Sequence, residues 1–171
     1  MITAPKVSSI QSYYINYIKL VNADVLNVLE NQLRKASNFF KELPEGKENF
    51  AYAPKKWTVK EVFGHMIDTE RIMAYRALAF ARGEKANLPG FDENVYVKNS
   101  GFALRSIGSL LEEFTQLRMS NIALFSSFSE EQLNRKGIAN NNEVDARLII
   151  YVIAGHFTHH MTVLHERYLS A

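Results

Sequence analysis

Apolar residues recur every three or four positions along most of this chain, which is the spacing of one face of an α-helix. The first such series consists of Leu26, Leu29, Leu33, Ala36, Phe40 and Leu43. Asn22 is a suitable N-cap before it, and the proline and glycine within 43–46 end it. The pattern therefore predicts a first long helix over residues 26–43.

A second long helix is predicted over residues 59–81. Thr58 and Glu61 form a capping box, in which each side chain accepts a hydrogen bond from the backbone of the other. Arg82 and Gly83 place glycine where many helices end. The same apolar spacing predicts helices over 104–128 and 144–169, with a short capped turn over 129–132 and an asparagine-rich loop over 140–142.

Four amphipathic helices without a strand candidate predict an all-α fold, a four-helix bundle. Residues 84–102 show no strong periodicity, and a connection of this length is typical of a crossover. The second and third helices would then run parallel. No repeat, low-complexity tract or flexible linker divides the sequence. We therefore expect one domain over residues 1–171, with residues 1–20 as an extended arm laid across the bundle.

The composition of the chain excludes several classes of protein function. Of the 171 residues, 47% are hydrophobic and 22% charged, which excludes wholesale disorder. The net charge is +2 and the signs are interspersed, so we expect no nucleic-acid partner. No apolar run is long enough to span a membrane, and the N-terminus lacks the apolar core of a signal peptide, so we expect a cytoplasmic protein. The absence of cysteine excludes disulfides, catalysis by a protein thiol and sulfur-based zinc sites.

The histidines are unevenly distributed, with four of the five between positions 156 and 165. His156 and His160 share the face of the fourth helix that carries its aliphatic residues. Side chains four positions apart on a helix have Cβ atoms about 6 Å apart, so two such imidazoles can bind one metal ion. His159 is displaced by about 100° from His160 towards the edge of this face. His165 is expected on the other side.

Burial of two imidazoles costs free energy unless their ring nitrogens find partners, and a metal ion would satisfy both. A third nitrogen ligand would have to come from His65, the one remaining histidine. Three histidines leave one position for water or substrate, which is typical of a catalytic site. The residues alone also permit a purely structural bundle, whose histidines are hydrogen-bonded polar groups of the core.

Three segments carry a resemblance to a known family. Residues 57–71 (WTVKEVFGHMIDTER) resemble the helix-two signature of the DinB-like family of metalloenzymes. Residues 154–160 (AGHFTHH) resemble its helix-four signature, and residues 88–93 (LPGFDE) resemble the crossover-loop motif of one branch. The resemblance extends over residues 18–169. The three motifs are most specific for the family when they occur together in their order along the chain.

The resemblance implies a bundle that binds one divalent metal ion through His65, His156 and His160, with His159 as a neighbour. Zinc or nickel is expected first, and iron or manganese also accept imidazole. The family includes S-transferases and isomerases that use low-molecular-weight thiols. A small-molecule substrate, a thiol that arrives as cosubstrate, and a homodimer are therefore expected. The alternatives are a metal-dependent hydrolase of a small substrate, or a non-catalytic metal- or ligand-binding bundle of a stress response.

Other polar residues near these histidines are weaker candidates. Asp68 lies one turn after His65 and could accept a hydrogen bond from its imidazole, or pair with Arg71 at the surface. Tyr75 and Arg76 could bind an anionic cosubstrate through their hydroxyl and guanidinium groups.

The crossover loop adds two carboxylates. Asp92, together with Glu93, could act as a general base if the loop folds over the bundle, or could serve only to form a turn.

Overall fold

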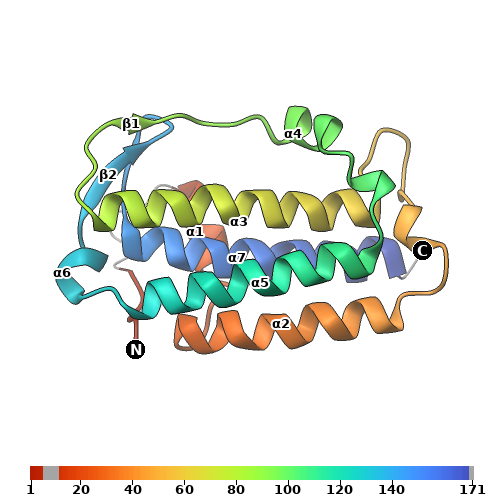
Figure 1. Ribbon diagram of the computed structural model, residues 1–171, viewed down its shortest axis with the longest axis horizontal. Helices are drawn as coiled ribbons and strands as arrows, with labels where there is room; N and C mark the ends of the chain where they lie inside the picture. The colour runs from red at the N-terminus through yellow and green to blue at the C-terminus, as the bar shows by residue number, and fades with distance from the viewer. Residues whose placement is uncertain (6–11, 170–171) are drawn as a thin grey trace.

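The computed structural model describes residues 1–5 and 12–169. Four long helices form its body (Figure 1): α2 (Val25–Glu42), α3 (Val59–Ala81), α5 (Ile107–Ser126) and α7 (Ala146–Leu164). This arrangement confirms the predicted all-α four-helix bundle. Helices α3 and α5 run in the same direction in Figure 1, as a crossover between them requires. None of the described helices is both long and apolar enough to cross a membrane.

The starts of the helices follow local capping chemistry. The capping box of Thr58 and Glu61 is confirmed, with the Thr58 amide donating to the Glu61 carboxylate over 2.8 Å. Helix α2, however, is capped by Asp24 and not by the expected Asn22. The Asp24 carboxylate accepts from the amides of the first turn and also from the amide of Ile2, over 3.0 Å. This long-range bond makes Asp24 the better cap.

The expected extended arm over residues 1–20 is wrong for its second half, because Ser12–Ile18 form helix α1. Helix α1 packs against α7 at Gly155, where a Cβ would lie 2.1 Å from the carbonyl oxygen of Tyr17. Residues 1–5 form neither helix nor strand and lie against α7, where the Tyr151 hydroxyl donates to the Ile2 carbonyl over 2.9 Å. The remainder of the arm, residues 6–11, lies outside the described residues.

The crossover between α3 and α5 contains structure that the periodicity did not indicate. It holds strand β1 (Asn87–Leu88), helix α4 (Glu93–Ser100) and a 3-10 helix (Phe102–Leu104), and it runs alongside α3 in Figure 1. Strand β1 pairs in parallel with β2 (Lys136–Ala139), which pairs antiparallel with β3 (Asn142–Asp145). The tight turn of this hairpin has Asn140 and Asn141 at φ values of 49° and 61°. Both values are typical of a two-residue hairpin turn.

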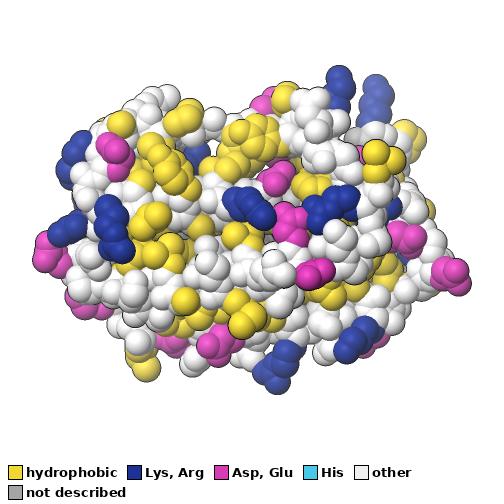
Figure 2. All heavy atoms as spheres, viewed as in Figure 1, with side chains coloured by type: hydrophobic (Ala, Val, Ile, Leu, Met, Phe, Trp, Pro, Cys, Tyr) yellow, Lys and Arg dark blue, Asp and Glu magenta, His cyan; other side chains and the backbone are white. Residues whose placement is uncertain are grey.

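The remaining boundaries differ little from the predicted ones. Helix α5 begins at Ile107 behind the cap Ser106, three residues later than expected. The short capped turn is helix α6 (Glu130–Leu133), and its capping box is confirmed. The fourth predicted helix consists of α7 and a π-helical continuation (His165–Leu169). A short 3-10 helix (Lys47–Asn49) lies between α2 and α3. Acidic and basic side chains are interspersed on the face seen in Figure 2.

A buried polar network joins all four long helices. The guanidinium of Arg118 on α5 is 0% exposed and donates two hydrogen bonds to Glu70 of α3, over 2.8 and 2.7 Å. It also donates to the side-chain oxygen of Gln32 on α2 over 2.7 Å. Asn121 donates to Glu70, and Gln32 donates to the carbonyl of Ala154 on α7 over 2.7 Å. The network separates the core into two apolar clusters, one towards each end of the bundle.

Candidate metal centre

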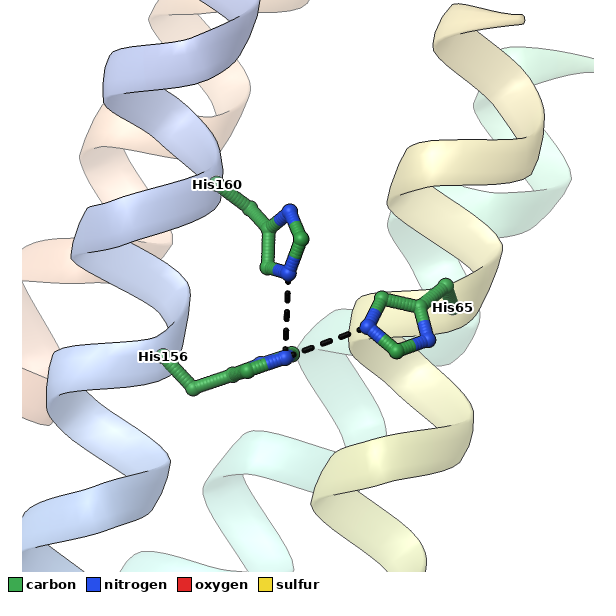
Figure 3. A group of neighbouring side chains, drawn as sticks. All are labelled: His65, His156 and His160. Carbon is green, nitrogen blue, oxygen red and sulfur yellow. Dashed lines mark hydrogen bonds between the residues drawn. The ribbon is translucent and has the colours of Figure 1, made fainter. Parts of the chain in front are cut away.

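Helices α3 and α7 bring three histidine side chains together (Figure 3). The Nε2 atom of His156 lies 3.1 Å from Nε2 of His65 and 3.1 Å from Nε2 of His160. One nitrogen of each ring lies within 4.8 Å of the other two. His65 and His156 are buried, and His160 is partly buried. The three histidines singled out in the sequence therefore occupy one place in the fold.

Hydrogen bonds between the rings account poorly for this arrangement. A neutral imidazole nitrogen carries either one N–H or one lone pair, so Nε2 of His156 can satisfy only one of its two neighbours. A metal ion accepts a lone pair from each nitrogen. Zinc binds imidazole nitrogen at 2.0–2.1 Å, which places two tetrahedral ligand atoms about 3.3 Å apart. The two distances of 3.1 Å from Nε2 of His156 are close to this value.

The environment keeps the three rings neutral, which is the form that binds metals. Burial lowers the pKa of His65 from 6.5 to about 4, although the nearby carboxylate of Glu93 raises it in part. Burial lowers the pKa of His160 to about 3, with further lowering by His65 and His159. The pKa of His156 lies well below 6.5, again through burial first and the neighbouring imidazoles second.

The polar side chain next to His65 is Thr69 and not Asp68. The hydroxyl of Thr69 lies 3.5 Å from Nδ1 of His65, where it can hold the ring with Nε2 turned towards the other histidines. Residues four apart are only about 40° apart around a helix, whereas residues three apart differ by about 60°. Asp68 points elsewhere: burial raises its pKa, and its charged neighbours include Arg71 and Glu113.

The two other histidines do not belong to this group of three, although His159 lines the same cavity. His159 is exposed, and its ring makes edge contacts with Tyr17 at 5.8 Å and with His160 at 5.0 Å. His165 is also exposed, and it packs against Phe39. The exposure of both agrees with the helical spacing, which put His159 towards the edge of the face that carries His156 and His160, and His165 on the other side.

The three histidines line one side of a cavity of about 400 Å³. This volume suits a small molecule. Helix α1 contributes Tyr14 and Tyr17 to its wall, and the ring of Trp57 lies 4.9 Å from that of His65. The crossover contributes Gly90, Phe91 and Glu93. The connection that carries no periodicity in the sequence therefore forms part of the site.

The three remaining candidates fall in different places. Arg76 is buried and lines the cavity, whereas Tyr75 is 58% exposed and does not. The carboxylate of Asp92 accepts hydrogen bonds from the amides of Asn94 and Val95, over 2.9 and 3.1 Å, and so caps α4. Of these two adjacent acids, Glu93 is the one that lines the cavity.

Comparisons with known proteins were consistent with this picture. A family model described as the DinB superfamily matches residues 29–164. Among solved structures, YfiT from Bacillus subtilis resembles this fold with a TM-score of 0.74 at 17% sequence identity, over 97% of this chain and 91% of that one. YfiT is described as a probable metal-dependent hydrolase with an unusual four-helix bundle topology. A search of curated proteins found no match.

Proposed function

The chain belongs to the DinB superfamily, and on that premise we propose that it is a divalent-metal-dependent hydrolase of a small molecule. The observation that carries the proposal is the convergence of three neutral imidazoles on the wall of a small cavity. The description of YfiT as a probable metal-dependent hydrolase supports the same reaction class.

The proposed ligands are His65, His156 and His160, and zinc or nickel is preferred over iron or manganese. When bound, such an ion would lower the pKa of a neighbouring water or thiol towards neutrality and would polarise a carbonyl group. Thr69 orients the ring of His65 through its Nδ1 atom. Trp57 and Phe91 contribute aromatic surface to the cavity wall.

Glu93 is the proposed proton acceptor. Its carboxylate lines the cavity and acts electrostatically on His65, so it lies on the side of the cavity where the metal would sit. A carboxylate in this place can take a proton from the attacking water and return it to the leaving group. Asp92 is not proposed for this role, because its carboxylate caps α4.

Metal content tests the ligand assignment. Purified protein is stripped, reloaded with each of the four metals and analysed by mass spectrometry, and we expect one ion per chain. Substitution of His65, His156 or His160 by alanine should abolish binding. His159→Ala is the matched control, since His159 is an exposed neighbour on the same helix. Equal loss in His159→Ala and His160→Ala would contradict the assignment.

Turnover tests the reaction. The loaded protein is assayed with small esters and amides, and separately with electrophiles in the presence of low-molecular-weight thiols. Metal-dependent hydrolysis supports the proposal, whereas consumption of thiol in place of water would assign S-transfer to the same site. Glu93→Gln should retain the metal and lower kcat by about 10²–10⁴. A bound metal without any turnover would leave a metal-binding bundle and refute the enzyme.

A further inference from the structure

The cavity of the three histidines ends at a second polar group, the guanidinium of Arg76. Arg76 follows His65 by eleven residues on α3, which is about three turns, so both lie on nearly the same face. Its side chain is 4% exposed and still lines the cavity. One guanidinium nitrogen contacts the sulfur of Met73 at 3.6 Å, so the side chain extends back along α3 towards His65.

Arg76 differs from the other buried arginines of the described chain in its charge balance. Arg118 and Arg147 each form an ion pair with a glutamate, Glu70 and Glu130 respectively. No carboxylate of the described residues lies within ion-pair distance of Arg76, and its oxygen partner is the carbonyl of Pro89, at 2.6 Å. Burial of a charge is costly, and here it lowers the pKa of the guanidinium, although the neighbouring Tyr14 raises it in part.

The cavity thus has two chemically different ends. The carboxylate of Glu93 acts on His65, at the end where the metal would bind. The guanidinium of Arg76 lies at the other end, with Met73 and Val152 as apolar lining between them. A guanidinium has five N–H donors in a planar fork, and its contacts with Pro89 and Met73 leave donors for a ligand. This fork matches the two oxygens of a carboxylate.

We propose that Arg76 binds a carboxylate of the substrate and thereby holds the reacting group at the three-histidine centre. This inference rests on the proposed function and specifies its substrate class. The Arg76 side chain extends back by about one of the three turns that separate it from His65. The substrate is therefore a small acid whose carboxylate lies about two helical turns, on the order of 10 Å, from its reacting group. The bound carboxylate supplies a counter-charge that the described residues do not provide.

A series of ω-carboxy hydroxamates tests this substrate class. Each carries a metal-binding hydroxamate at one end and a carboxylate at the other, separated by two to eight methylenes. Titration calorimetry with the zinc-loaded protein compares each compound with its methyl ester, and acetohydroxamate measures the metal centre alone. At the best length we expect the free acid to bind at least tenfold tighter than the ester. A phosphonate series distinguishes a carboxylate site from a phosphate site.

Variants of Arg76 test whether the tighter binding of the free acid depends on this residue. Arg76→Met should abolish the difference between acid and ester and leave acetohydroxamate affinity unchanged, while Arg76→Lys should retain part of the difference. Arg82→Met is the matched control, because Arg82 ends the same helix and is exposed. Circular dichroism verifies that each variant is folded. If Arg76→Met does not fold, the proposal is tested by whether Arg76→Lys reduces the difference in affinity between acid and ester.

The possible failures are distinguishable. If acetohydroxamate binds and acids and esters bind equally at every length, the inference about Arg76 is wrong and the metal centre stands. If no metal or hydroxamate binds, the proposed function fails. In that case the metal-free protein is tested by thermal shift with octanoate and octanamide. Stabilisation by octanoate alone, lost in Arg76→Met, would support the carboxylate site, and equal effects of both compounds would overturn it.

Discussion

Substitution of Arg118 by methionine is expected to remove more stability than substitution of any arginine at the surface. Methionine has a similar length but no charge and no donor, so the core keeps most of its volume. Glu70, which is 3% exposed, would lose both hydrogen bonds from Arg118 and retain the one from Asn121 at 3.0 Å. Gln32 would lose the donor to its side-chain oxygen.

The magnitude follows from the charge left behind. Removal of one partner of a buried ion pair costs about 3–5 kcal/mol, because the other charge stays buried without compensation. Domains of this size have about 5–15 kcal/mol of stability, so Arg118→Met should still fold, with a clearly lower midpoint of unfolding. The pair of Arg135 and Glu131 at the surface provides the comparison; Arg135 also donates to the Ala81 carbonyl over 2.8 Å, so Arg135→Met should cost about 1–2 kcal/mol.

Urea denaturation of four proteins measures the coupling energy between Arg118 and Glu70. The four proteins are the parent, Arg118→Met, Glu70→Leu and the double variant. If the charges compensate each other, the double variant should be more stable than the sum of the single losses predicts, by on the order of 2 kcal/mol. Arg135→Met serves as the control. Equal losses in Arg118→Met and Arg135→Met, or strict additivity of the two core variants, would refute the reasoning.

Two further predictions concern packing and protonation. Gly155→Ala should lower the free energy of unfolding by about 1–3 kcal/mol, because its methyl group would collide with the Tyr17 backbone. Gly108→Ala, in the uncrowded first turn of α5, should raise the free energy of unfolding by up to about 1 kcal/mol. Denaturation experiments in which both substitutions change the stability in the same direction would contradict this account. The metal-free protein should lose stability as the pH falls from 6.5 towards 4, because the unfolded chain protonates His65 at 6.5 and the folded chain only near a pKa of about 4. That contribution is about 3 kcal/mol, and a pH series of urea denaturations should show it missing in His65→Gln.

The bundle could be predicted because its helices are long and their signals are local. The capping box at Thr58 and the apolar face of α3 require only neighbours in sequence. Helical spacing also separated His156 and His160 from His159, which is exposed and lines the cavity without belonging to the group of three. These inferences need only the angle of 100° between successive residues.

The predictions that failed concern positions where local sequence allows more than one structure and a contact with a distant part of the chain decides between them. Asn22 is as good a cap as Asp24 by residue type, but only Asp24 also binds the amide of Ile2. Strands of two and four residues are too short to show an alternating pattern. Asp92 and Glu93 are adjacent carboxylates, and the start of α4 decides which one caps the helix and which one lines the cavity.

The buried network had a signal that sequence reasoning missed. Gln32 follows Leu29 by three residues and precedes Ala36 by four, so it occupies a core position of α2. A polar side chain at such a position requires a partner in the core. The sequence cannot tell which partner, because Glu70 and Arg118 come from helices whose register is set only on packing.

One turn of α7 connects this network to the candidate metal centre. Gln32 donates to the hydroxyl of Thr158 over 3.0 Å, and His156, two residues earlier, faces His65 on α3. Residues two apart lie about 200° apart on a helix, so this turn is held from opposite sides. Apolar side chains can repack when helices shift, whereas hydrogen bonds in a buried network require defined distances. The network therefore fixes α7 where the nitrogen spacing of the three histidines needs it.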